Sequence, residues 1–94
     1  MNKPKKTSIM SEISRFYGII ITMYFPDHNP PHFHVRYNDF RALINIPTGE
    51  MTGSMSRKAL EFVYEWMDLH KDELWENWRR MENGEPLKSI KPLD

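Results

Sequence analysis

The sequence predicts a single α+β domain, an antiparallel meander of three or four strands packed on one face by a C-terminal helix or kinked helix pair. Apolar and polar residues alternate over 32–37 and 40–46, which is typical of strands with one buried face. Apolar residues then recur at helical spacing between 56 and 83. A chain of 94 residues has room for one small core, so both patterns belong to one domain.

Composition narrows the classes of function. Thirteen basic residues balance thirteen acidic ones, so no overall field draws the protein to nucleic acid or an anionic membrane, and any anion site must be local. The absence of cysteine excludes disulfides, thiolate catalysis and cysteine zinc sites. No apolar run approaches the roughly 20 residues of a membrane span. We therefore expect a cytoplasmic protein without a membrane partner.

The N-terminal part predicts a leader and then a strand. Residues 1–11 begin polar and basic and show no period, so we expect a flexible leader ahead of a domain at 12–94. Residues 14–25 are apolar at every odd position from 17 onward, which predicts one strand. Pro26 ends that strand because proline lacks the amide hydrogen needed to continue a sheet.

Residues 32–46 predict a hairpin with a defined register. Asn38 and Asp39 both tolerate positive φ and suit a two-residue turn. On the core face this turn pairs Tyr37 with Phe40, Val35 with Ala42 and Phe33 with Ile44. On the other face it pairs His32 with Asn45, His34 with Leu43 and Arg36 with Arg41. A shift of one residue would expose every core side chain, so the register is strongly specified.

The C-terminal half predicts an edge strand and helical structure. Residues 47–50 form a turn, and 51–53 make a short edge strand. Ser54 or Ser56 caps the helical segment. Because 56–83 is long for one helix, we expect a kink or break near His70. Gly84 ends the helix, and the tail packs along the body of the domain.

The polar face of the hairpin carries the candidate site. Opposed Arg36 and Arg41 repel each other unless an anion lies between them. One interpretation is an ordinary half-exposed sheet face. A second is an anion- or protein-binding surface. The residues assigned to partner binding are His28, His32, His34, Arg36, Arg41, Asn45 and Trp75, the last because it lies off the main apolar stripe.

A third interpretation is a metal site. His32 and His34 share a strand face, and Asp27 or His28 would supply a third ligand. The spacing matches no established zinc signature, and no third ligand is fixed by strand geometry. We therefore expect no cofactor and no tightly bound zinc. Without a metal, His32 and His34 would be the catalytic acid and base of an enzyme that cleaves RNA.

The chain also resembles a known family over residues 12–93. The matching segments are Ile13-Ser14-Arg15-Phe16-Tyr17-Gly18-Ile19, Asp27-His28-Asn29-Pro30-Pro31-His32-Phe33-His34-Val35, Ala42 with Thr48-Gly49-Glu50, Trp66–His70, Glu73-Leu74, Trp78 and Gly84-Glu85-Pro86-Leu87. They resemble the bacterial domain of unknown function 4160 family. The resemblance implies a small bacterial protein, often beside a partner of the 2442 unknown-function family in a toxin–antitoxin-like arrangement. It implies no catalytic residue.

These observations favour a non-catalytic binding module. We expect one component of a two-protein unit, whose histidine- and arginine-bearing sheet face binds a small protein partner or an anionic ligand such as a phosphate or nucleic acid. The alternative is a histidine- or metal-dependent phosphodiesterase acting on RNA. Exposure of His32 and His34 in a shared concave site, with the second helix far away, would favour the enzyme, whereas a flat face would favour binding.

Overall fold

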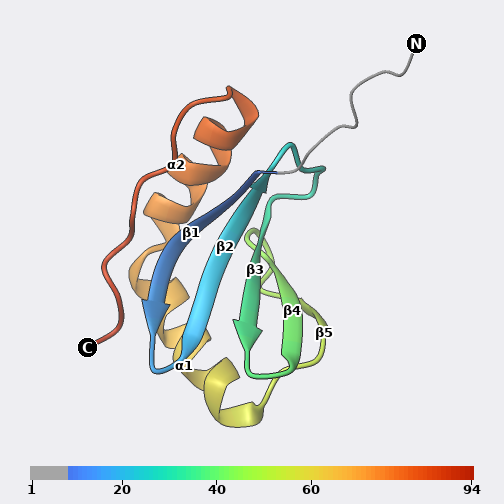
Figure 1. Cartoon of the computed structure of the whole chain (residues 1–94), viewed down its shortest axis with the longest axis vertical. Coiled ribbons are helices and arrows are strands. Elements are labelled where there is room, and N and C mark those ends of the chain that lie inside the picture. Colours follow the sequence, from blue (N-terminus) through green and yellow to red (C-terminus); the bar gives the residue numbers. More distant parts are fainter. Residues whose placement is uncertain (1–8) are drawn as a thin grey trace.

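The computed structural model describes residues 9–94 and shows a five-stranded antiparallel sheet followed by two helices (Figure 1). The strands lie in chain order, β1-β2-β3-β4-β5. Their bounds are Ile9–Phe16 for β1, Ile19–Phe25 for β2, His32–Tyr37 for β3, Phe40–Asn45 for β4 and Met51–Gly53 for β5. Helix α1 spans Arg57–Leu69 and α2 spans Lys71–Glu82. The α+β class is confirmed, but the sheet has five strands where three or four were expected.

The additional strand arises because 14–25 is not one strand. Tyr17 and Gly18 have φ angles of 53° and 79°, so they form a tight turn that joins β1 to β2. Because Tyr17 is apolar, the alternating pattern continues through the turn, and the sequence pattern does not reveal the turn. Residues 9–11, expected in the leader, belong to β1. The rest of that leader, 1–8, lies outside the described residues.

A bulge in β1 changes which side chains face the core. The pairing with β2 shifts between Glu12 and Ser14, so one residue is inserted at Ile13. Ile13 and Phe16 are both buried although they differ in parity along the strand. The outer edge of β1 is partly covered, because the Ile90 amide donates to the Ile13 carbonyl at 2.7 Å.

The β3–β4 hairpin has the register that the sequence predicts, pair for pair. Asn38 takes a φ of 51° in the turn, as expected. Phe33, Val35 and Ile44 are buried beneath the helices. The short edge strand β5 also has the predicted bounds. The confirmed register places the polar alternate residues of β3 and β4 on the opposite face of the sheet.

The helical segment is two helices broken at His70. The Ser56 hydroxyl accepts from the Ala59 amide and so caps α1. His70 has φ −126° and ψ 27°, which are not helical, and α2 begins directly after it. The kinked helix pair is therefore confirmed. The buried Trp66 ring packs edge-to-face with the Phe33 ring, with a centroid distance of 5.9 Å.

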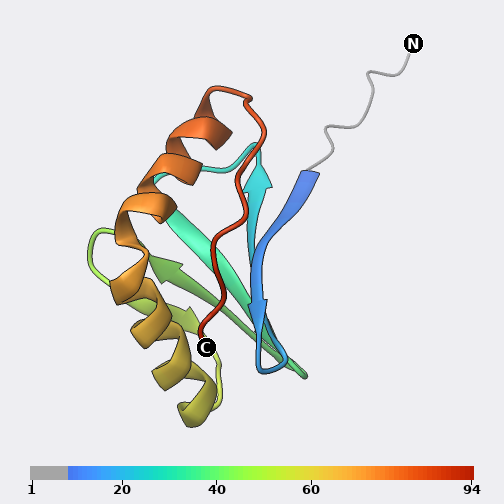
Figure 2. The same ribbon diagram turned by 90° about the vertical axis from the view of Figure 1, so that its left-hand side faces the viewer.

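The C-terminal segment is fastened to the helices and to β1. Asn77 is 1% exposed, and its amide group both donates to the Lys88 carbonyl and accepts from the Lys88 amide, at 2.8 and 2.9 Å. The Trp66 indole donates to the Lys91 carbonyl at 2.9 Å. Figure 2 shows this segment running down between the helices and β1. The tail thus packs along the body, as the sequence predicts.

Both helices cover the same face of the sheet. Figure 2 shows them on one side, and no other element of residues 9–94 lies on the opposite side. Within the same residues neither helix has the length and apolar character required to cross a membrane. The uncovered sheet face is where the candidate site lies.

Candidate functional site

Two adjoining hollows occupy the uncovered face. The first, of about 290 Å³, is lined by Met10, Thr22, Tyr24, His34, Val35, Arg36, Arg41, Ala42, Leu43, Thr52 and Gly53. The second, of about 430 Å³, is lined by Asp27, His28, Asn29, Pro30, His32, His34, Leu43, Asn45, Glu50 and Thr52. His34, Leu43 and Thr52 belong to both. The face is therefore concave, with arginines at one end and a histidine cluster at the other.

The arginine end has two cations held side by side. Arg36 and Arg41 are directly opposed across β3 and β4, and both are exposed. The Arg41 guanidinium donates to the carbonyls of Asn38 and Phe40, each at 3.1 Å. Within residues 9–94 neither arginine has a carboxylate at ion-pair distance. Like charges opposed in this way are unfavourable until an anion approaches.

The Glu12 carboxylate is attracted by Arg36, but it forms its ion pair with Arg15. Both of its carboxylate oxygens accept from the Arg15 side chain, at 2.7 and 2.9 Å. The pKa of Glu12 is lowered chiefly by this hydrogen bond, and the attraction of Arg36 is the smallest cause. Glu12 therefore does not neutralise the arginine pair.

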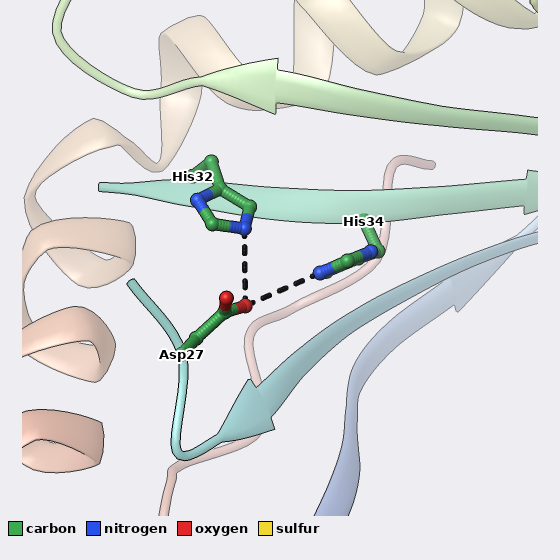
Figure 3. Close-up of side chains that lie close together, drawn as sticks. All are labelled: Asp27, His32 and His34. Atoms are coloured by element: carbon green, nitrogen blue, oxygen red, sulfur yellow. Dashed lines mark hydrogen bonds and ion pairs between the residues drawn. The ribbon is translucent and has the colours of Figure 1, made fainter. Parts of the chain in front are cut away.

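At the other end, Asp27 and two histidines converge (Figure 3). Asp27 lies in the loop after β2, and His32 and His34 are alternate residues of β3. The Asp27 Oδ2 atom lies 3.0 Å from His32 Nε2 and 3.3 Å from His34 Nε2. Proline restricts the backbone in this loop, at 26, 30 and 31, which limits how far Asp27 can move from β3.

Backbone groups orient two of these three side chains. The His28 amide donates to Asp27 Oδ1 at 2.8 Å, so the other carboxylate oxygen points at the histidines. His32 Nδ1 lies 2.7 Å from the Pro30 carbonyl, which can only accept, so this nitrogen carries a proton. In a neutral His32 ring, Nε2 therefore presents a lone pair toward Asp27.

The cluster is sheltered by aromatic rings. Side-chain exposure is 13% for His32, 18% for Asp27 and 28% for His34. The His32 ring packs 5.4 Å from Trp78 of α2, and the His34 ring 4.4 Å from Tyr24. Burial lowers the pKa of His34, although a hydrogen bond that the Asp27 carboxylate accepts from this ring acts in the opposite direction. The neutral imidazole, which can act as a ligand or a base, is thus favoured at His34.

Three of the sequence-predicted site residues belong neither to the Arg36–Arg41 pair nor to the cluster of Asp27, His32 and His34. The His28 residue is exposed and contributes its backbone amide, while its ring is not part of the convergent group. Asn45 accepts from the Thr48 amide at 2.9 Å and so stabilises the turn before β5. Trp75 is 40% exposed and lines a separate hollow on α2 with Trp78.

Sequence reasoning assigned no role beside the histidines to Tyr24 and Trp78. Tyr24 lies on the same face of β2 as Thr22, which pairs with His34. The alternation along β2 could therefore have placed Tyr24 on the same face as His34. Trp78 was assigned to the core, where it is 3% exposed, and its packing against His32 depends on where α2 crosses the sheet. The periodicity of apolar residues does not indicate where a helix crosses a sheet.

Comparison with known proteins gives a family match. Residues 18–79 match the family model described as Domain of unknown function (DUF4160). No curated protein and no solved structure matches the chain. The matched residues cover strands β2 to β5, the loop 26–31, all of α1 and most of α2. The chain therefore belongs to the domain of unknown function 4160 family.

Proposed function

We propose that this chain is a binding module, one component of a two-protein toxin–antitoxin-like unit, and that Arg36 and Arg41 hold an acidic group of a small protein partner. The observation that carries this proposal is the opposed arginine pair on a concave, uncovered sheet face. The two-protein unit follows the arrangement that the family resemblance implies.

The partner supplies a negative charge beside Arg36 and Arg41. A carboxylate between the two guanidinium groups removes their repulsion and accepts charge-assisted hydrogen bonds of about 1.5–3 kcal/mol each. The hollow beside them is lined by apolar atoms of Met10, Tyr24 and Leu43. An acidic side chain flanked by apolar ones therefore complements this surface in both charge and chemistry.

The test is calorimetric titration of the chain with the partner protein of the 2442 unknown-function family. Arg36→Gln should weaken binding about tenfold or more, since each tenfold change corresponds to about 1.4 kcal/mol. Arg57→Gln, at an exposed arginine that begins α1, is the matched control and should leave affinity unchanged. Binding should also weaken with added salt. Equal losses in both variants would refute the assignment.

A second candidate, a phosphodiesterase acting on RNA, is favoured by the histidine geometry. His32 and His34 have ring centroids 5.2 Å apart and both line the second hollow. Histidine is the side chain that most often acts as a general acid or base, so the two imidazoles would supply both groups and the arginines would hold the phosphate. Incubation with end-labelled short RNA tests it: cleavage that disappears in His34→Ala but persists in His28→Ala would replace the binding module with an enzyme.

A further inference from the structure

We propose that Asp27, His32 and His34 form a binding site for a divalent first-row transition metal such as zinc, with its remaining coordination positions open to the second hollow. The inference is independent of the partner binding proposed above, which concerns the arginine end of the face. Three observations carry it: the spacing of the donor atoms, the hydrogen bonds that orient His32 and Asp27, and the chemistry of the donor set.

The spacing of the donors fits one bound ion. One donor atom from each residue lies within 4.8 Å of the other two, and the carboxylate oxygen is 3.0 and 3.3 Å from the two Nε2 atoms. Zinc bonds to imidazole nitrogen and carboxylate oxygen of about 2.0–2.2 Å place neighbouring donors roughly 3.0–3.5 Å apart in octahedral or tetrahedral geometry. The two separations that involve Asp27 therefore already match those of coordinated ligands, and the third lies within 4.8 Å.

Backbone hydrogen bonds also orient two of the three ligands toward a common point. His32 donates its Nδ1 proton to the Pro30 carbonyl and turns Nε2 toward Asp27. Asp27 accepts the His28 amide on Oδ1 and presents Oδ2. Metal-binding histidines and carboxylates are characteristically held by such outer hydrogen bonds. His32 Nε2 and the Asp27 carboxylate oxygen attract each other when a cation, either a proton or a metal ion, is bound between them.

The donor set selects the class of metal. Two imidazoles and one carboxylate suit zinc, iron(II) and related ions, whereas magnesium and calcium prefer oxygen donors. Three protein ligands with an open side are the arrangement of catalytic rather than structural metal sites. The sequence expectation of no bound zinc rested on the lack of a fixed third ligand, and the structure places Asp27 in that position.

Titration of the full chain with the metal alone tests the proposal. Untagged protein is freed of metal with a chelator and titrated with zinc chloride by calorimetry, with magnesium chloride in a parallel run. We expect one zinc ion per chain, a Kd below about 10 µM and no comparable magnesium binding. Cobalt(II) should give the visible absorption of an ion with nitrogen and oxygen donors.

Matched variants separate this site from adventitious binding. Two single variants, Asp27→Asn and His32→Ala, should each weaken zinc binding about 100-fold or more. Asp27→Asn still offers an oxygen that accepts from the His28 amide. His28→Ala removes an exposed imidazole beside the site and should leave the affinity unchanged. Absence of saturable zinc binding would overturn the proposal. So would an equal loss in His28→Ala, or a cobalt spectrum unaltered by Asp27→Asn.

Discussion

Replacement of Phe33 by alanine should destabilise the fold far more than replacement of Arg36 three residues along the same strand. Phe33 is 0% exposed and packs edge-on against Trp66 at 5.9 Å. Removing a buried phenylalanine side chain costs about 3–5 kcal/mol, from lost burial and from the cavity that remains. Whole domains of this kind are stable by only about 5–15 kcal/mol. Phe33→Ala should therefore remove a large part of the stability.

Arg36→Ala is the matched control because its side chain lies on the uncovered face. The change should cost little, or stabilise slightly, since it relieves the repulsion from Arg41. Urea unfolding followed by tryptophan fluorescence measures both variants. At a slope of about 2 kcal/mol per molar urea, Phe33→Ala should lower the midpoint by roughly 2 M. Equal shifts in the two variants would show that the faces of β3 have been assigned wrongly.

Three further predictions concern the tail, the edge strand and the helix surface. Asn77→Ala removes two buried hydrogen bonds to the C-terminal segment and should cost about 2–3 kcal/mol, with faster amide exchange in 88–90. Gly53→Ala should unfold at lower temperature than Gly84→Ala: both have positive φ, but only at Gly53 does a Cβ meet a backbone carbonyl, at 2.5 Å. The hydrogen bond from Arg79 lowers the pKa of Glu76 from 4.5. The ionised Glu76 side chain therefore stabilises the fold above pH 4.5, and this contribution is lost as the pH falls below that value. The difference in thermal midpoint between Glu76→Gln and the unaltered chain should accordingly be present at pH 7 and vanish in acid, and a difference that persists there would contradict the pairing.

The elements with clean periodicity were predictable and those with irregular backbone were not. Alternation over β3 and β4, together with a turn that tolerates positive φ, determined their register correctly. The break at His70 was predicted from the length of the helical pattern and from Asp72 and Glu73, whose negative charge suits a new helix N-terminus. The β1–β2 hairpin was missed because Tyr17 is apolar yet sits in the turn. The bulge at Ile13 then reversed the parity of β1, and a two-residue period cannot show such an insertion.

The candidate site was only partly predictable for a related reason. Strand spacing alone placed His32 and His34 on one face and opposed Arg36 to Arg41. The convergence of Asp27 on the histidines depends on the path of the proline-containing loop, which no period reports. The distinction between Asp27 and His28 as the third group depends on a single backbone hydrogen bond. Tertiary geometry therefore decides the chemistry of the cluster.

The most direct test of the central claim, that the uncovered sheet face is the functional surface, is nuclear magnetic resonance mapping of partner binding. The chain, labelled with ¹⁵N, is titrated with the partner protein of the 2442 unknown-function family, and the shifted amides are assigned. We predict shifts concentrated in residues 32–45, which carry the arginine pair and the histidines. Shifts confined to α1 and α2, with 32–45 unmoved, would contradict the account.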